Sequence, residues 1–283
     1  MPVTFLQSVA ILARVLESRL NLAERRTHTI AKYIILPASA MAPWFLKPRY
    51  TAIHKRVDGV FIVDSFGMTG DDSNLPTETY VSDALQYIHW RTGMLCVACQ
   101  CNGAGYTELD RAARMIRDGL DDLKIGHVSF CVIISMGNDI YSRAWYDRHK
   151  RAHDTQLADS VANGMTRVFI YSQEFLSKNT LVVYGGASEV WGYDRAVVAG
   201  IEHVWFGVKY NQYVKEVLKQ LRLRGVDCIA GIRLGPVRTI DRIGHIHAES
   251  LNVVVNAYVL WARLAAGMPL RDSESATYPK SKL

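Results

Sequence analysis

Short apolar runs alternate with longer stretches of helical spacing along most of the chain. Five runs are rich in Val, Ile and Cys and are bounded by Gly, Asp or Asn, which is the pattern of strands buried on both faces of a sheet. The predicted strands are residues 60–63, 94–99, 128–135, 180–184 and 226–229.

The stretches between and after these runs carry apolar residues on one helical face. In residues 212–224, for example, Val214, Val217 and Leu221 follow the i, i+3, i+7 spacing of an amphipathic helix. The predicted helices are residues 79–91, 109–122, 155–176, 212–224 and 248–266. Strand and helix repeated in turn predict an α/β protein, a three-layer α/β/α sandwich with a five-stranded parallel sheet.

We expect one α/β domain over residues 57–267, with an N-terminal helical extension (residues 1–56) and a polar C-terminal tail (residues 268–283). Residues 5–33 have an amphipathic helical pattern with arginines at polar positions. This pattern partly imitates an organelle transit peptide, but Glu17 and Glu24 favour a helix packed on the domain.

The composition is that of a folded protein. Of the 283 residues, 49% are hydrophobic and 21% are charged, which excludes disorder, collagen-like repeats and a small disulfide-stapled scaffold. The longest candidate for a membrane span, residues 253–264, is short and contains Asn256 and Arg263. We therefore expect no membrane span.

Five cysteines, an odd number with no recognisable secretory leader, favour free thiols in a reducing compartment. The expectation is a cytoplasmic protein, with organelle targeting by the N-terminus left open. Cys96 and Cys99 form a C-x-x-C pair, but the pair lies inside an apolar run and no second pair follows at zinc spacing. We expect buried strand cysteines and no metal site.

The net charge is +6, from 33 basic and 27 acidic residues, and it is mild evidence for an acidic partner. The basic residues are scattered, so we expect no nucleic-acid partner. Gly103 and Gly105 begin a dinucleotide-type loop, but Glu108 stands where the third glycine belongs, so a nucleotide cofactor is not expected.

Hydroxyl and amide groups follow the first three predicted strands. Asp64 and Ser65 come directly after the first strand, Gly105 lies in the loop after the second, and Asn138 follows the third. In a parallel α/β sheet, ligands bind beyond the carboxyl ends of the strands, so these groups are expected at one edge.

A loop beyond the fifth strand adds an imidazole, because it holds Asp241, His245 and His247 just before the last helix. A hydroxyl nucleophile, an imidazole base and amide donors for a developing oxyanion are the parts that acyl transfer needs. The sequence therefore suggests acyl-transfer chemistry.

The order of these groups resembles the SGNH hydrolase superfamily, also called GDSL-type esterases and lipases, over residues 57–266. The resemblance rests on Asp64-Ser65, on Gly105, on Asn138-Asp139 and on His245 before the last helix. It implies flavodoxin-like strand order 2-1-3-4-5. It also implies hydrolysis of a small-molecule ester, an acylated carbohydrate or lipid, without a cofactor.

The resemblance implies that Ser65 is the nucleophile and that an acyl-serine intermediate forms. The backbone N–H groups of Ser65 and Gly105 and the side chain of Asn138 would form the oxyanion hole. By contrast, Asp64 and Asp139 are expected to orient loops through Asx-type hydrogen bonds.

Two positions depart from the family pattern, since Val63 replaces a glycine and Arg242 stands where an aspartate is expected three residues before His245. Asp241 could still complete a triad through a one-residue bulge, and otherwise a Ser–His dyad remains. His247 is the alternative base. These departures keep a second interpretation open, a catalytically inactive protein that binds a small molecule, carbohydrate or protein.

Residues 139–154 are expected to form a polar aromatic loop beside the site. Tyr141 and Trp145 would contact the acyl or sugar part of a substrate there, and the alternative is that Trp145 packs inward.

Overall fold

The computed structural model describes residues 32–36, 56–71, 76–185, 201–231 and 245–270, and of residues 32–36, 76–78 and 201–204 only the backbone. Its larger sheet is parallel and has the order β1-β5-β2-β6-β7-β8. The strands are β1 (Lys32–Leu36), β2 (Gly59–Val63), β5 (Cys96–Cys101), β6 (Phe130–Ser135), β7 (Thr180–Tyr184) and β8 (Cys228–Ala230).

The predicted fold class and strand order are confirmed. The five predicted strands correspond to β2, β5, β6, β7 and β8, and their arrangement is 2-1-3-4-5. The sheet has one strand more than predicted, because β1 pairs with β5 at the edge. Lys32 and Tyr33 belong to this strand rather than to the predicted N-terminal helix, and residues 1–31 lie outside the described residues. A short apolar run such as β1 cannot be separated from a helix end by periodicity alone.

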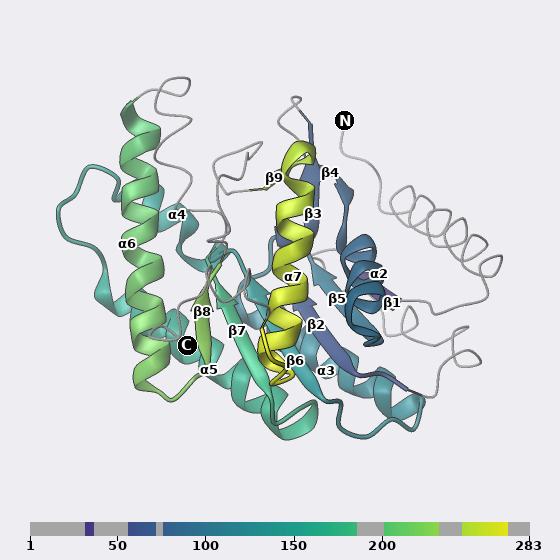
Figure 1. Cartoon of the computed structure of the whole chain (residues 1–283). Helices are drawn as coiled ribbons and strands as arrows, with labels where there is room; N and C mark the ends of the chain where they lie inside the picture. Colours follow the sequence, from purple (N-terminus) through teal and green to yellow (C-terminus); the bar gives the residue numbers. More distant parts are fainter. Residues whose placement is uncertain (1–31, 37–55, 72–75, 186–200, 232–244, 271–283) are drawn as a thin grey trace.

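Helices cover both faces of the sheet (Figure 1). Helices α2 (Val81–Thr92) and α7 (Leu251–Ala265) pack on one face, and α3 (Tyr106–Asp122), α5 (Thr155–Phe175) and α6 (Ile201–Leu223) pack on the other. α4 (Asn138–Tyr146) lies against α6 and corrects the prediction of a loop over residues 139–154. Helix α4 is only nine residues long and rich in polar residues, so its apolar periodicity is weak.

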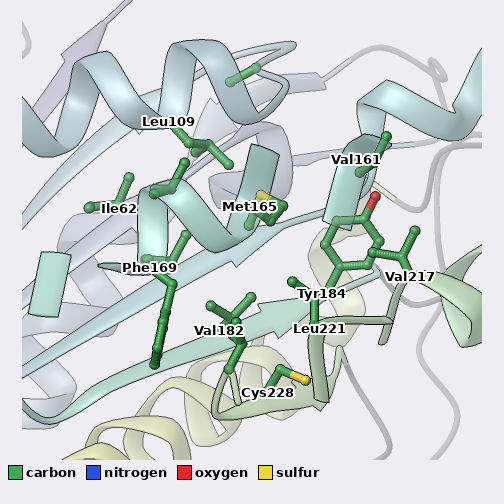
Figure 2. Packing of buried hydrophobic residues seen from close by; sticks show 14 of the residues in the cluster. Ile62, Leu109, Val161, Met165, Phe169, Val182, Tyr184, Val217, Leu221 and Cys228 are labelled. Atoms are coloured by element: carbon green, nitrogen blue, oxygen red, sulfur yellow. The ribbon is translucent and has the colours of Figure 1, made fainter. Parts of the chain in front are cut away.

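Successive side chains along the strands point to opposite faces of the sheet, so the hydrophobic core consists of two clusters. In β2, Val60 and Ile62 pack towards α3 and α5, whereas Phe61 and Val63 pack towards α2 and α7. Figure 2 shows the first of these clusters, in which Ile62 lies near side chains of the helices. Because successive side chains of a strand point to opposite faces, a strand with apolar residues at every position is buried on both.

A smaller sheet lies next to the start of α7 (Figure 1) and has the order β4-β3-β9. Its strands are β3 (Met68–Gly70), β4 (Pro76–Thr79) and β9 (Ile246–His247). β9 pairs in parallel with β3, and the Thr69 hydroxyl donates to the carbonyl oxygen of Ile246 at 2.8 Å. This sheet anchors the histidine segment beside the residues that follow Ser65.

All five cysteines are buried free thiols, as expected. Cys96 belongs to the core cluster on the α2 side of β5 and Cys99 to the cluster on the α3 side. Burial raises the pKa of the Cys96 thiol, and a side-chain hydrogen bond with Cys101 together with burial raises the pKa of the Cys99 thiol. Their side chains lie on opposite faces of one strand, so this C-x-x-C pair cannot bind one metal ion together. Within the described residues, no helix has the length and apolar character that crossing a membrane requires.

Candidate active site

The chain leaves the centre of the sheet at Asp64 and turns through a short 3-10 helix, η2 (Ser65–Gly67). Oδ1 of Asp64 accepts the backbone N–H of Phe66 at 2.9 Å and so caps this turn, which confirms the Asx-type role expected for Asp64. Ser65 is 4% exposed, and its hydroxyl donates to Sδ of Met136 at 3.6 Å. Ser65 therefore sits at the carboxyl end of β2, against the segment that follows β6.

The second carboxylate oxygen of Asp64 binds that neighbouring segment. Oδ2 accepts the backbone N–H of Met136 at 2.5 Å and the side-chain amide of Asn138 at 3.3 Å. The register explains this proximity, because Val63 at the end of β2 is paired with Ile134 near the end of β6. One buried carboxyl group thus joins the ends of two adjacent strands.

Complete burial raises the pKa of Asp64 from 3.8 to about 7. The N–H groups of Phe66 and Met136, the electrostatic contact with His245 and the Ser135 hydroxyl act in the opposite direction and favour the carboxylate. His245 follows Asp64 at a great distance along the chain, so its electrostatic contact with Asp64 is a product of the tertiary fold.

The two predicted oxyanion donors lie near this carboxyl group but have protein partners. The Gly105 N–H donates to the carboxylate of Glu108 at 3.0 Å in a capping interaction at the start of α3. The Asn138 amide donates to the carbonyl oxygen of Ala104 at 3.0 Å as well as to Asp64. Each donor would have to exchange its present acceptor for a substrate oxygen.

Close contacts explain two glycines at this edge. A Cβ on Gly105 would lie 2.2 Å from Oδ1 of Asp139, whose other oxygen accepts the N–H of Tyr106 at 3.0 Å. Gly137 has φ of 78° as the chain turns from β6 into α4, a conformation that glycine adopts without a steric penalty. Burial raises the pKa of Asp139.

The two candidate histidines have different surroundings. His245 is 7% exposed, precedes β9 and interacts electrostatically with Asp64. His247 has its Nδ1 oriented to accept the backbone N–H of Glu249 at 3.2 Å, which caps the 3-10 turn η4 (Ala248–Ser250). The two rings thus differ in their contacts, because His245 acts on Asp64 whereas the Nδ1 of His247 caps a turn.

The remaining predicted site residues are Tyr141, Trp145 and Asp241. Tyr141 and Trp145 both pack on Phe206 of α6, with ring centroids 5.2 and 5.5 Å apart respectively. The Arg148 guanidinium lies 4.3 Å above the Trp145 ring. Asp241 lies outside the described residues.

Two residues at this edge of the sheet, Ser135 and Met136, and the contacts of Asp64 with the neighbouring segment were not predicted from the sequence. Asp64 reaches Met136 and Asn138, the Met136 sulfur accepts from Ser65, and Ser135 accepts the N–H of Gly137 at 3.1 Å. The signal in the sequence is their place at strand ends, because Asp64 and Met136 directly follow predicted strands and Ser135 is the last residue of one. In the part of the chain that the structure describes, no group of three or more His, Cys, Asp or Glu side chains is arranged to hold a metal ion.

The parallel sheet, its strand order and the helices on both of its faces define an α/β/α sandwich with flavodoxin-like strand order. The chain is similar to the solved structure of a carbohydrate acetylesterase family member from Sinorhizobium meliloti, with 13% identity, 75% of this chain and 100% of that chain covered, and a TM-score of 0.48. It is also similar to Est24, a carbohydrate acetylesterase from the same organism, with 16% identity, coverage of 72% and 97%, and a TM-score of 0.48.

A third similar structure is the inhibitor-bound aryl esterase of M. smegmatis, with 15% identity, coverage of 75% and 100%, and a TM-score of 0.46. No protein-family model matches the chain, and no curated protein matches its sequence.

Proposed function

We propose that the protein is a serine esterase that hydrolyses a carboxylic ester of an acylated carbohydrate or lipid. The observation that carries the proposal is that Ser65 and His245 are both next to one buried carboxyl group, that of Asp64. Asp64 precedes Ser65 directly and interacts electrostatically with His245, which β9 anchors beside β3.

In the proposed reaction, the Ser65 hydroxyl leaves the Met136 sulfur and its oxygen attacks the ester carbonyl carbon, while His245 takes the proton. The tetrahedral intermediate breaks the bond to the alkoxy oxygen, and His245 returns the proton to the departing alcohol. Water then attacks the acyl-serine with the same histidine as base. The products are the carboxylic acid and regenerated Ser65.

The proposed oxyanion donors are the N–H groups of Ser65 and Gly105 and the Asn138 amide. Binding of the oxyanion requires the Gly105 N–H to leave Glu108 and an Asn138 N–H to leave Ala104. Each donor recruited in this way is worth about 3 kcal/mol of barrier in comparable sites.

The test is hydrolysis of p-nitrophenyl acetate together with labelling by a fluorophosphonate. The wild-type protein is expected to be labelled, and Ser65→Ala is expected to lose labelling and about a thousand-fold or more of its activity. His245→Gln is expected to lose activity in the same way and His247→Gln to retain most of it. Ser129→Ala is a matched control, since Ser129 is exposed and precedes β6 at the opposite end of the sheet.

A binding protein without catalysis is the second candidate, because the Ser65 hydroxyl and both distant oxyanion donors hold protein acceptors. It predicts that folded wild-type protein is neither labelled nor active. Labelling that persists in Ser65→Ala would contradict the assignment of the nucleophile.

A further inference from the structure

We propose that Asp64 is a positioning residue of this site, which holds the Asn138 amide and the Met136 turn in place and supplies the negative charge that stabilises protonated His245. This inference rests on the proposed function. In a Ser–His–Asp triad, Asp241 would stabilise the protonated histidine. The inference assigns this role to Asp64, the residue next to the nucleophile.

The first argument is the set of groups that Asp64 holds. Its two oxygens accept three hydrogen bonds, from Phe66 N–H, Met136 N–H and the Asn138 amide. Capping η2 needs only the first of these bonds. The other two fix the side chain proposed as an oxyanion donor and the residue whose sulfur accepts from Ser65.

The second argument is the free-energy cost of burying a charged carboxyl group at residue 64. Asp64 is completely buried, and ionised carboxyl groups in such places are disfavoured unless donors and opposite charges surround them. Serine or asparagine would cap the same turn without that cost. A buried carboxyl group kept beside a nucleophile and an imidazole is therefore typical of a functional site.

The third argument is that His245 is in electrostatic contact with Asp64 and lowers the pKa of this carboxyl group. Among the residues that the structure describes, the phenols of Tyr80, Tyr184 and Tyr258 are also in electrostatic contact with this carboxyl group, and burial raises the pKa of each. These phenols stay neutral at the pH at which Asp64 titrates. The imidazolium that forms when His245 takes the proton of Ser65 is thus opposite a carboxylate.

The kinetic test compares Asp64→Asn with Asp58→Asn. Both carboxyl groups flank β2 and are buried, but Asp58 is at the amino end, where it accepts the N–H of Leu95 at 2.8 Å. With p-nitrophenyl acetate, Asp64→Asn is expected to lower kcat about 100-fold, comparable to the loss of one oxyanion donor, with KM changed less than about threefold. Asp58→Asn is expected to lose stability and to keep its kcat.

A double variant tests whether Asp64 acts through Asn138. Because the two side chains are in contact, Asp64→Asn and Asn138→Ala together are expected to lower kcat by clearly less than the product of their separate effects. A wild-type kcat in Asp64→Asn, in a protein for which Ser65→Ala is inactive, would overturn this inference and leave the proposed function intact.

A second measurement does not depend on turnover. The carboxyl carbon of Asp64, labelled with ¹³C and assigned by its absence in Asp64→Asn, is followed by NMR between pH 5 and 9. The titration midpoint is expected to rise in His245→Gln, because the favourable charge of His245 is removed, and to stay in place in His247→Gln. An unchanged midpoint in His245→Gln would overturn the pairing whether or not the protein is an esterase.

Discussion

At the scale of single residues, Asp64 shows how the tertiary fold adds contacts to a residue of a common type. An aspartate after a strand is ordinarily a helix or turn cap, and Asp64 does cap η2. The neighbouring strand end adds Met136 and Asn138 as further donors, and the distant His245 adds a charge. None of these partners can be identified from the residues next to Asp64.

The burial of Asp64 makes a prediction about stability and pH. The pKa of Asp64 is about 7 in the folded protein and 3.8 for the free side chain, so the folded state retains this proton longer than the unfolded state does. The stabilisation is complete below about pH 4 and is lost as the pH rises to about 7. At about 1.4 kcal/mol per pKa unit, this loss is up to about 4 kcal/mol.

Asp64→Asn has no such titration, so its free energy of unfolding is expected to rise relative to that of the wild type between pH 5 and pH 8. Urea unfolding of both proteins at several pH values measures the difference. A difference that stays constant over this range would contradict the pKa given to Asp64.

At the scale of elements, the start of α3 shows how closely two loops meet at the sheet edge. Gly105 is the N-cap residue of α3, and the Asp139 carboxylate of α4 lies where a side chain on Gly105 would be. Oδ2 of Asp139 accepts the backbone N–H of Tyr106 in the first turn of α3. The two helix starts therefore hold each other in place.

Gly105→Ala is expected to destabilise the protein by about 1 to 3 kcal/mol, because the new methyl group displaces Asp139. Gly119→Ala in the same helix is the control, since a Cβ there meets nothing within 4 Å, and it is expected to stabilise by about 0.5 to 1 kcal/mol. Thermal or urea unfolding measures both. Equal effects of the two substitutions would contradict the close approach of α3 and α4.

At the scale of the whole molecule, one sheet separates two apolar layers, and strands β2, β5, β6, β7 and β8 contribute to both. The cysteines can be used to test this arrangement, because they are buried on both faces of the sheet. Cys96 lies in the layer with α2 and α7, whereas Cys99, Cys131 and Cys228 lie in the layer with α3, α5 and α6.

Burial raises the pKa of Cys131 to about 12 and that of Cys228 to about 11, so their reactive thiolates are scarce at pH 8. We expect no thiol to react with Ellman's reagent in the native protein and all five to react in guanidinium chloride. Reaction of one thiol well before global unfolding would show that one apolar layer opens by itself.

The fold could be predicted because its signals are local. Strands such as residues 60–63 are apolar at every position and the helices have a regular apolar stripe, so alternation alone indicates a parallel sheet with helices on both faces. The additional strand β1 and helix α4 were not predicted, since their short runs have no distinctive period.

Sequence by itself determined the alternation of strands and helices and the appearance of Asp64-Ser65, Asn138 and His245 directly after or before regular elements, whereas the order of the central strands was implied by the family resemblance. Only the tertiary structure decided that His245 is in electrostatic contact with Asp64, that Gly105 and Asn138 donate to protein acceptors, and that Tyr141 and Trp145 pack on α6. The physical reason is the distance along the chain over which each effect acts. Hydrophobic periodicity and capping preference act within a few residues. Hydrogen bonds and burial at the ends of the strands join segments that only the folded chain brings together.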